Sequence, residues 1–195
     1  MPIKRTLKGL PIKPSTMPEV IDIRHYQPKA SDIFIFDNSV WMYLFCPLGN
    51  YNQKKQKYYS SFLKQAQSAR STIFTISLVI SEFANRYLRL DFEGWKQTEK
   101  RYNADFKRDF VGSGRYQSTV EDLQISISKI MQVAEKGSDN FNAIDLSSVS
   151  KHLAHIDYND SYLLELSKLN NYSIVTDDKD FVKYHLHNVR IIICQ

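Results

Sequence analysis

The sequence predicts an α/β fold, a three-layer sandwich in which helices cover both faces of a central parallel sheet of four to five strands. Short, wholly apolar runs such as residues 33–36 are typical of strands buried on both faces. Segments with apolar residues at helical spacing alternate with these runs along the chain. The length of 195 residues fits one domain that also carries a helical-hairpin insert.

Residues 1–31 are predicted to form a basic, proline-containing arm ahead of a single domain over residues 32–195. The arm holds five of the six prolines, and its six basic and two acidic residues supply most of the formal net charge of +5. The sequence shows neither the apolar core of a signal peptide nor a run of about 18 apolar residues. We therefore expect a cytoplasmic protein without a membrane partner.

The first half of the domain is expected to alternate strands and helices. Residues 33–36 form the first strand, and helices follow over about 39–45 and 53–69, separated by Pro47 and Gly49. Residues 72–76 form the second strand, and Ser77 caps a helix that runs to about Leu90. Residues 92–110 and 118–135 are two further helices. The Gly-Ser-Gly run at 112–114 lets the chain reverse between them, which gives a helical-hairpin insert over about 92–140.

The second half completes the sheet. A short helix over about 146–154 precedes a helix that begins at Asn159 or Asp160 and ends near residue 169. Residues 173–176 form the third strand, residues 180–185 a short helix, and residues 189–194 the closing strand. This alternation of strands and helices indicates a parallel sheet.

Acidic residues from distant parts of the sequence are predicted to meet at one edge of this sheet. Asp37 follows the first strand, and Asp177 and Asp178 follow the third. Glu82 lies one turn into the helix after the second strand, and Asp160 lies in the first turn of the helix that leads into the third. Because ligands bind at the carboxyl ends of parallel strands, these side chains are candidates for one shared site.

Each of these acids also has a simpler interpretation. Asp160 would favour any helix N-terminus through the helix dipole. Glu82 and Arg86 would form a surface ion pair at i,i+4 spacing. Asp178 would serve as a turn residue. The conjunction of all of them at one sheet edge favours the shared site.

These motifs resemble those of the PIN-domain family, whose members are metal-dependent ribonuclease-like proteins and include the toxins of toxin–antitoxin systems. Residues 36–40, Phe-Asp-Asn-Ser-Val, are similar to the opening motif, and residues 77–83 to the second, a helix led by Ser or Thr whose Glu points to the metals. Residues 160–163 and 174–181 resemble the third and fourth motifs. The resemblance covers about residues 33–90 and 155–193 and leaves out the arm and the insert.

The sequence departs from the family pattern in a few places. Asn38 stands where the family often has Thr or Ser, so Ser39 or the backbone is expected to do that residue's work. Asp157 lies three residues before the preferred third ligand and is expected to cap the helix or to support the ligands from behind. Asp177 competes with its neighbour for the fourth position, and Asp180 is a second-rank candidate there.

The resemblance implies a Mg²⁺ or Mn²⁺ site, and the donor set agrees, since clustered carboxylates repel one another and suit hard dications. Asp37 is expected to be the central ligand, with Asp160 and Asp178 as the others. Glu82 is expected to be a ligand or a base that positions water. Thr176 is expected to hydrogen-bond a ligand carboxylate or a water.

The resemblance implies RNA, with single-stranded RNA preferred, as the substrate. The segment between Asp37 and Glu82 agrees with a polyanionic substrate, since it contains basic residues and no acidic one. Phosphate contacts and base stacking predict a nucleic-acid-binding set of Lys54, Lys55, Lys57, Tyr58 and Tyr59, to which Arg115 of the insert is added. A solvated helix face explains the same residues equally well.

The sequence therefore predicts a metal-dependent endoribonuclease, acting as a toxin or in RNA processing. An antitoxin or another protein partner and a homodimer follow from the resemblance. The alternative is a catalytically inactive PIN fold that binds RNA or protein. A dehalogenase-like phosphatase is disfavoured because Ser39 stands where that family has a second Asp.

Overall fold

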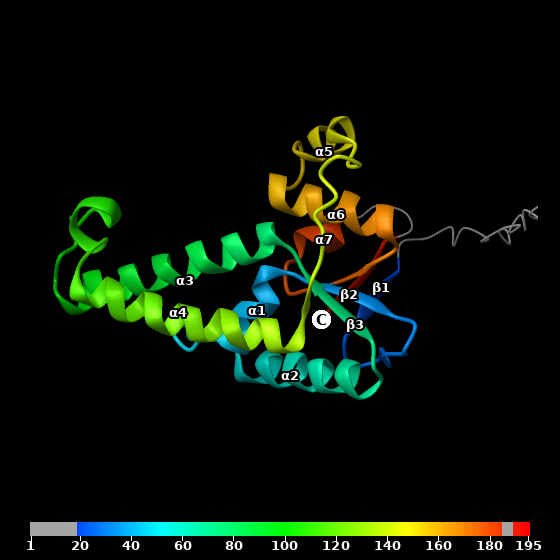
Figure 1. The fold of residues 1–195 in the computed structure, drawn as a ribbon, viewed down its shortest axis with the longest axis horizontal. Coiled ribbons are helices and arrows are strands. Elements are labelled where there is room, and N and C mark those ends of the chain that lie inside the picture. Colours follow the sequence, from blue (N-terminus) through cyan, green and yellow to red (C-terminus); the bar gives the residue numbers. More distant parts are fainter. Residues whose placement is uncertain (1–18, 185–188) are drawn as a thin grey trace, which may run out of the picture.

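The computed structural model describes residues 19–184 and 189–195. Its centre is a six-stranded sheet in the order β1-β6-β5-β2-β3-β4, with parallel pairing between all neighbours. The strands are β1 Val20–Asp22, β2 Ile33–Phe36, β3 Thr72–Thr75, β4 Glu135–Lys136, β5 Ser173–Thr176 and β6 Arg190–Ile193. The predicted α/β class with a parallel sheet between helices is confirmed (Figure 1).

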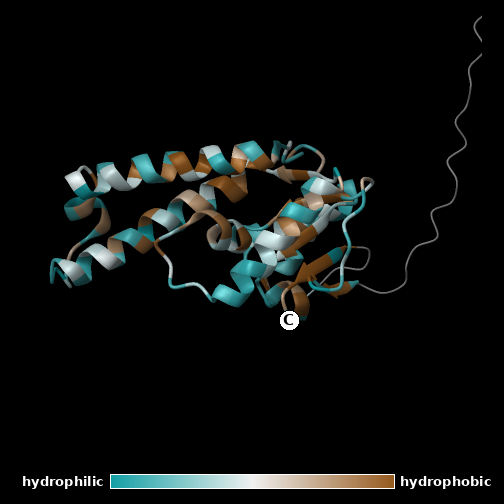
Figure 2. Cartoon of the chain, turned by 90° about the horizontal axis from the view of Figure 1, so that it is seen from below, coloured by the Kyte–Doolittle hydropathy of each residue, from teal (hydrophilic) through white to brown (hydrophobic). Residues whose placement is uncertain are grey.

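Strand β2 lies inside the sheet and is apolar on both faces. Ile35 pairs with Phe74 of β3 on one side and with Ile174 of β5 on the other. Phe34, Ile35 and Phe36 are fully buried, which explains why the strand lacks an alternating polar pattern. Brown, hydrophobic stretches accordingly lie in the sheet in Figure 2, whereas the helices alternate hydrophobic and hydrophilic residues.

Helices cover the two faces of the sheet. Helices α1 Asn38–Phe45 and α2 Gln53–Ser68 follow β2, and α5 Leu146–His152, α6 Tyr158–Asn170 and α7 Asp180–Lys183 belong to the last part of the chain. Helix α2 lies on one side of the sheet and α6 on the other (Figure 1). The buried residues of α2, which are Tyr59, Phe62, Leu63 and Ala66, form the apolar stripe expected for a helix packed on a core.

Helices α3 Ser77–Thr98 and α4 Gly114–Val133 form an antiparallel hairpin that projects from the domain (Figure 1). The expected helix end near Leu90 and the expected separate helix over 92–110 are wrong, since α3 runs unbroken to Thr98 and a π-helical turn follows at Phe106–Phe110. Asp91 is buried inside this hairpin, where it accepts hydrogen bonds from Arg115 and Thr119. These bonds fasten α3 to α4 at the position where the sequence suggested a break.

The sheet has one strand more than the upper expectation, because two very short strands extend its edges. Val20–Asp22, which the sequence analysis placed in the arm, pairs in register with Ile191–Ile193 of β6. Glu135–Lys136 pairs with β3 at the opposite edge. Residues 19–31 therefore belong to the domain, while residues 1–18 of the predicted arm and residue 185 of the predicted short helix lie outside the described residues.

Cys46 and Cys194 are both buried and both carry free thiols. No helix in the described ranges has the length and apolar character that crossing a membrane requires.

Candidate functional site

The site is built around Asp37, which directly follows β2 and caps the N-terminus of α1. Its side chain is only 6% exposed. One oxygen, Oδ2, accepts hydrogen bonds from Ser39 Oγ at 2.6 Å, from Thr176 Oγ1 at 2.9 Å and from the Ser39 amide at 3.3 Å. The carboxylate is therefore oriented by the first turn of α1 and by the end of β5.

Ser39 and Thr176 also hold the turn after β5. The amide of Asp177 donates to Ser39 Oγ at 3.0 Å, and the amide of Asp178 donates to Thr176 Oγ1 at 2.9 Å. Both hydroxyl groups thus connect Asp37 to the backbone that carries the next acidic residues. The bond from Thr176 to the Asp37 carboxylate is the kind of contact that the sequence suggested for Thr176.

Glu82 approaches the same edge from the second turn of α3. Its two carboxylate oxygens accept hydrogen bonds from the side-chain amides of Asn38 at 3.0 Å and Asn159 at 3.1 Å. The alternative of a Glu82–Arg86 surface pair is wrong, because Glu82 is held by neutral amides instead and Arg86 has no ion pair within the described residues. Asn159 was expected only as a possible helix start, and its contact with Glu82 is visible only in the structure.

Asp160 lies in the first turn of α6, and Asp157 caps this helix. The Asp157 carboxylate accepts the Asp160 amide at 2.9 Å, so Asp157 is occupied with capping. Burial raises the pKa of Asp160 to about 8, and the charges of Asp37, Asp157, Asp178 and Glu82 add to the effect. Asp160 thus lies among several other negative charges.

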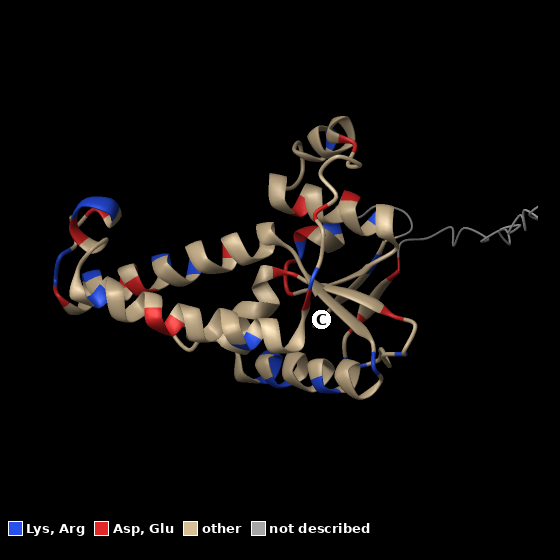
Figure 3. Ribbon diagram, in the orientation of Figure 1, with Lys and Arg blue, Asp and Glu red and all other residues tan. Residues whose placement is uncertain are grey.

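The pKa values of Asp37 and Glu82 are raised as well. Burial raises the pKa of Asp37, although the hydrogen bonds from Ser39 and Thr176 oppose the change. Burial and the neighbouring Asp37 raise the pKa of Glu82. The edge of the sheet therefore gathers carboxyl groups whose ionised forms are destabilised by burial and by one another. Figure 3 shows acidic residues at this edge and basic residues along α2.

The two acids after β5 have different surroundings. Asp177 accepts Lys55 Nζ at 2.8 and 2.9 Å, Tyr59 Oη at 2.9 Å and Tyr43 Oη at 3.0 Å, so both of its oxygens are occupied. Asp178 is exposed, and its side chain accepts only the amide of Asp180, at 2.8 Å, among the described residues. Asp178 is therefore the better placed of the two to bind a ligand. Asp180 forms an ion pair with Lys183.

The chemistry of this donor set suits a hard divalent cation. Its side chains offer carboxylate oxygens, and Asn38 adds a buried Oδ1 that has no hydrogen-bond partner among the described residues. Within residues 19–184 and 189–195, no three or more Asp, Glu, His or Cys side chains lie close enough together to hold a metal ion as they stand.

The residues predicted to bind nucleic acid do not form one surface. Tyr59 is fully buried, so the prediction that its ring stacks on bases is wrong. Lys55 is paired with Asp177, and Arg115 is paired with Asp91 in the hairpin, so the charges of both are already compensated. Lys54 and Lys57 are exposed on α2. Tyr58 is half-buried, with the guanidinium of Arg24 at 5.8 Å from its ring centroid.

Comparison with known proteins agrees with this architecture. A family model of the PIN domain matches residues 34–185, which is more than half of the chain. The chain is 13% identical to a structure of VapBC2 from Rickettsia felis bound to a promoter DNA fragment, with a TM-score of 0.50 over 82% of this chain and 96% of that one. It is 14% identical to FitAcB from Neisseria gonorrhoeae, with a TM-score of 0.48 over 82% and 96% of the two chains.

No curated protein matches the chain in a sequence search. At these identities the structural likeness concerns the fold alone, whereas the family model covers every motif from Asp37 to Asp178. The chain belongs to the PIN domain family.

Proposed function

We propose that this protein is a Mg²⁺- or Mn²⁺-dependent endoribonuclease that hydrolyses phosphodiester bonds at Asp37, Glu82, Asp160 and Asp178. The observation that carries the proposal is the concentration of carboxylates around Asp160, whose pKa is raised to about 8. Such a site is stabilised when a divalent cation neutralises its charge. Nuclease activity is also what membership of the PIN domain family supports.

In this proposal each acid has a separate task. Asp37 is the central ligand, because Ser39 and Thr176 fix one of its oxygens and hold its orientation. Asp160 and Asp178 complete the ligand set. A bound Mg²⁺ or Mn²⁺ supplies Lewis-acid activation of water and charge stabilisation at the phosphate. Glu82, held at both oxygens by amides, serves as a further ligand or positions the attacking water.

An inactive PIN fold that only binds RNA or protein is the second candidate. The complete set of four acids argues against it, since nothing in a binding module would maintain several buried, mutually repelling carboxylates. An antitoxin partner and a homodimer remain proposals that rest on the family. The likeness to the fold of VapBC2 from Rickettsia felis agrees with the first of them.

The direct test is cleavage of mixed single-stranded RNA in Mn²⁺ by the wild type and by Asp160→Asn. We expect cleavage by the wild type and a loss of at least about 100-fold in the variant, because a metal ligand is removed. Asp122→Asn is the matched control, since it makes the same change at an exposed position on α4. Cleavage that survives both Asp160→Asn and EDTA would refute the proposal.

The toxin role has its own test. Expression of the wild type is expected to arrest growth of the host cell, and Asp37→Asn is expected to relieve the arrest. Equal arrest by both proteins would separate toxicity from the carboxylate site, and no arrest by the wild type would favour RNA processing.

A further inference from the structure

A hollow of about 450 Å³ adjoins the carboxylates on the side of α1 and α3. It shares Ser39 and Asp178 with the candidate site, so it continues directly from it. Its lining residues are Ser39, Met42, Tyr43, Tyr51, Lys55, Arg86, Asp177, Asp178 and Lys179. A group bound in this hollow would therefore lie next to the proposed cleavage position.

Some of the charged side chains that line this hollow are paired with one another and others are not. Lys55 and Asp177 neutralise each other through contacts of 2.8 and 2.9 Å. Arg86 and Lys179, by contrast, have no hydrogen bond or ion pair from their side chains to any described residue, and both are exposed. Once Asp178 is engaged by a cation, these two free positive charges dominate the hollow.

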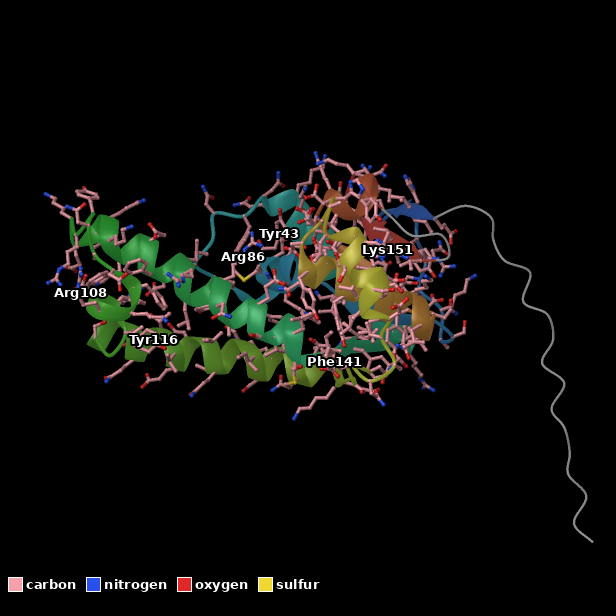
Figure 4. The ribbon with its side chains drawn as sticks, turned by 90° about the horizontal axis from the view of Figure 1, so that it is seen from above. Tyr43, Arg86, Arg108, Tyr116, Phe141 and Lys151 are labelled. Atoms are coloured by element: carbon pink, nitrogen blue, oxygen red, sulfur yellow. The ribbon has the colours of Figure 1, made fainter. Side chains whose placement is uncertain are left out.

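The position of Arg86 follows from its helix. It lies four residues after Glu82 on α3, so the two side chains share one face of the helix with about 6 Å between their Cβ atoms. Glu82 is bound by Asn38 and Asn159, which leaves the guanidinium free to point into the hollow beside Tyr43 (Figure 4). The Tyr43 and Tyr51 rings, 5.1 Å apart, form the adjoining wall.

We propose that Arg86, assisted by Lys179, forms a phosphate subsite that binds a non-scissile phosphodiester group next to the bond that is cut. This inference rests on the proposed function and specifies how the substrate backbone is held. A guanidinium suits the task because its planar fork donates two parallel hydrogen bonds to phosphate oxygens. The arrangement explains why a free arginine is placed one helical turn from a carboxylate site.

Binding tests the subsite without catalysis. We compare Arg86→Gln with the matched Arg89→Gln, both in the cleavage-deficient Asp37→Asn background, using a fluorescent single-stranded RNA in Mg²⁺. Arg89 is on the same helix, but its guanidinium lies 4.0 Å from the Phe106 ring centroid in the hairpin. Arg86→Gln is expected to weaken binding about 10-fold and to lower the salt slope by about 0.7, one phosphate contact.

Arg89→Gln is expected to leave both quantities near those of the Asp37→Asn parent. Equal Kd values and salt slopes for Arg86→Gln and the parent would overturn the subsite. An equal loss of affinity in Arg89→Gln would overturn it too, as would a parent that shows no measurable binding to RNA. Since Arg86 is exposed and has no partner among the described residues, its replacement is not expected to disturb folding.

Cleavage separates this inference from the proposed function. A short RNA carries one neutral methylphosphonate at each linkage in turn, and the wild type is compared with Arg86→Gln, both with Asp37 intact. One non-scissile substitution is expected to slow the wild type about 10-fold and to have no further effect on Arg86→Gln. If the wild type cleaves the RNA and the methylphosphonate substitutions slow both proteins equally, the subsite alone is overturned. No wild-type cleavage would overturn the proposed function, while the binding comparison still decides the subsite.

Discussion

Replacing Asp160 with asparagine is expected to stabilise the metal-free protein while abolishing its activity. In the folded state the pKa of Asp160 is about 8, against an ordinary value of 3.8. The folded protein therefore holds this proton more tightly than the unfolded chain does. The free energy of unfolding is highest where both states are protonated and falls as the pH rises from about 4 to about 8.

The size of the effect follows from the same pKa. A tenfold difference in proton affinity corresponds to about 1.4 kcal/mol, so Asp160 costs the fold at most about 4 kcal/mol at pH 7. Solvent reaches part of the side chain and reduces this cost, so we expect Asp160→Asn to raise the free energy of unfolding by about 1–3 kcal/mol. Asparagine keeps the shape of the side chain and removes its charge.

Urea unfolding in EDTA at pH 5, 7 and 8 measures the change, with Asp122→Asn as the control for loss of an exposed charge. The gain in the free energy of unfolding caused by Asp160→Asn is expected to grow from pH 5 to pH 8. The effect of Asp122→Asn is expected to stay the same over this range. With added Mn²⁺ the wild type is expected to become more stable than Asp160→Asn, because the ion binds and stabilises the wild type and not the variant. A variant that is less stable than the wild type in EDTA at pH 8 would refute the reasoning.

Three further substitutions test contacts around the site by urea unfolding. Tyr59→Phe removes the hydroxyl whose one proton is shared between the Thr176 carbonyl at 2.8 Å and Asp177 Oδ1 at 2.9 Å, and which accepts from the Cys194 amide at 3.2 Å, so we expect a loss of about 1–3 kcal/mol; an unchanged midpoint would contradict this. Asp91→Ala removes a buried carboxylate that accepts hydrogen bonds from Arg115 and Thr119 and is expected to cost about 1–3 kcal/mol, more than Asp109→Ala at the more exposed pair with Arg108; equal losses would show that burial is unimportant there. Gly49→Ala would place a Cβ 2.2 Å from Tyr51 Cζ, so the ring must move and we expect a loss of about 1–3 kcal/mol; wild-type stability would mean that the ring shifts freely.

The sequence was sufficient to predict the inner strands and the edge at which the acids meet. Residues 33–36 are wholly apolar, and residues 173–176 carry the apolar pair Ile174 and Val175 at their centre, because both faces of these strands are covered; these short runs are readable without a structure. The outer strands β1 and β4 have three and two residues, so neither leaves a periodic pattern to read. Their pairing depends on partners far away in the sequence.

Side-chain partners were harder to predict than backbone elements. Tyr59 looked like a stacking residue beside three lysines, yet it lies on the same stripe as Phe62 and Ala66 and is buried with them. A helix end was expected near Leu90, because the contact that buries Asp91 comes from Arg115 on another helix. The same reason explains why Asn159 was missed, since only the fold brings it to Glu82.

The most direct test of the account is the position of Mn²⁺ in a crystal of the wild-type protein, located by its anomalous scattering. The account predicts a peak coordinated by Asp37, Asp160 and Asp178, with Glu82 in contact or one water away, and no such peak in Asp160→Asn. A saturating soak that leaves no peak among these carboxylates, or one that places Mn²⁺ only elsewhere, would contradict it.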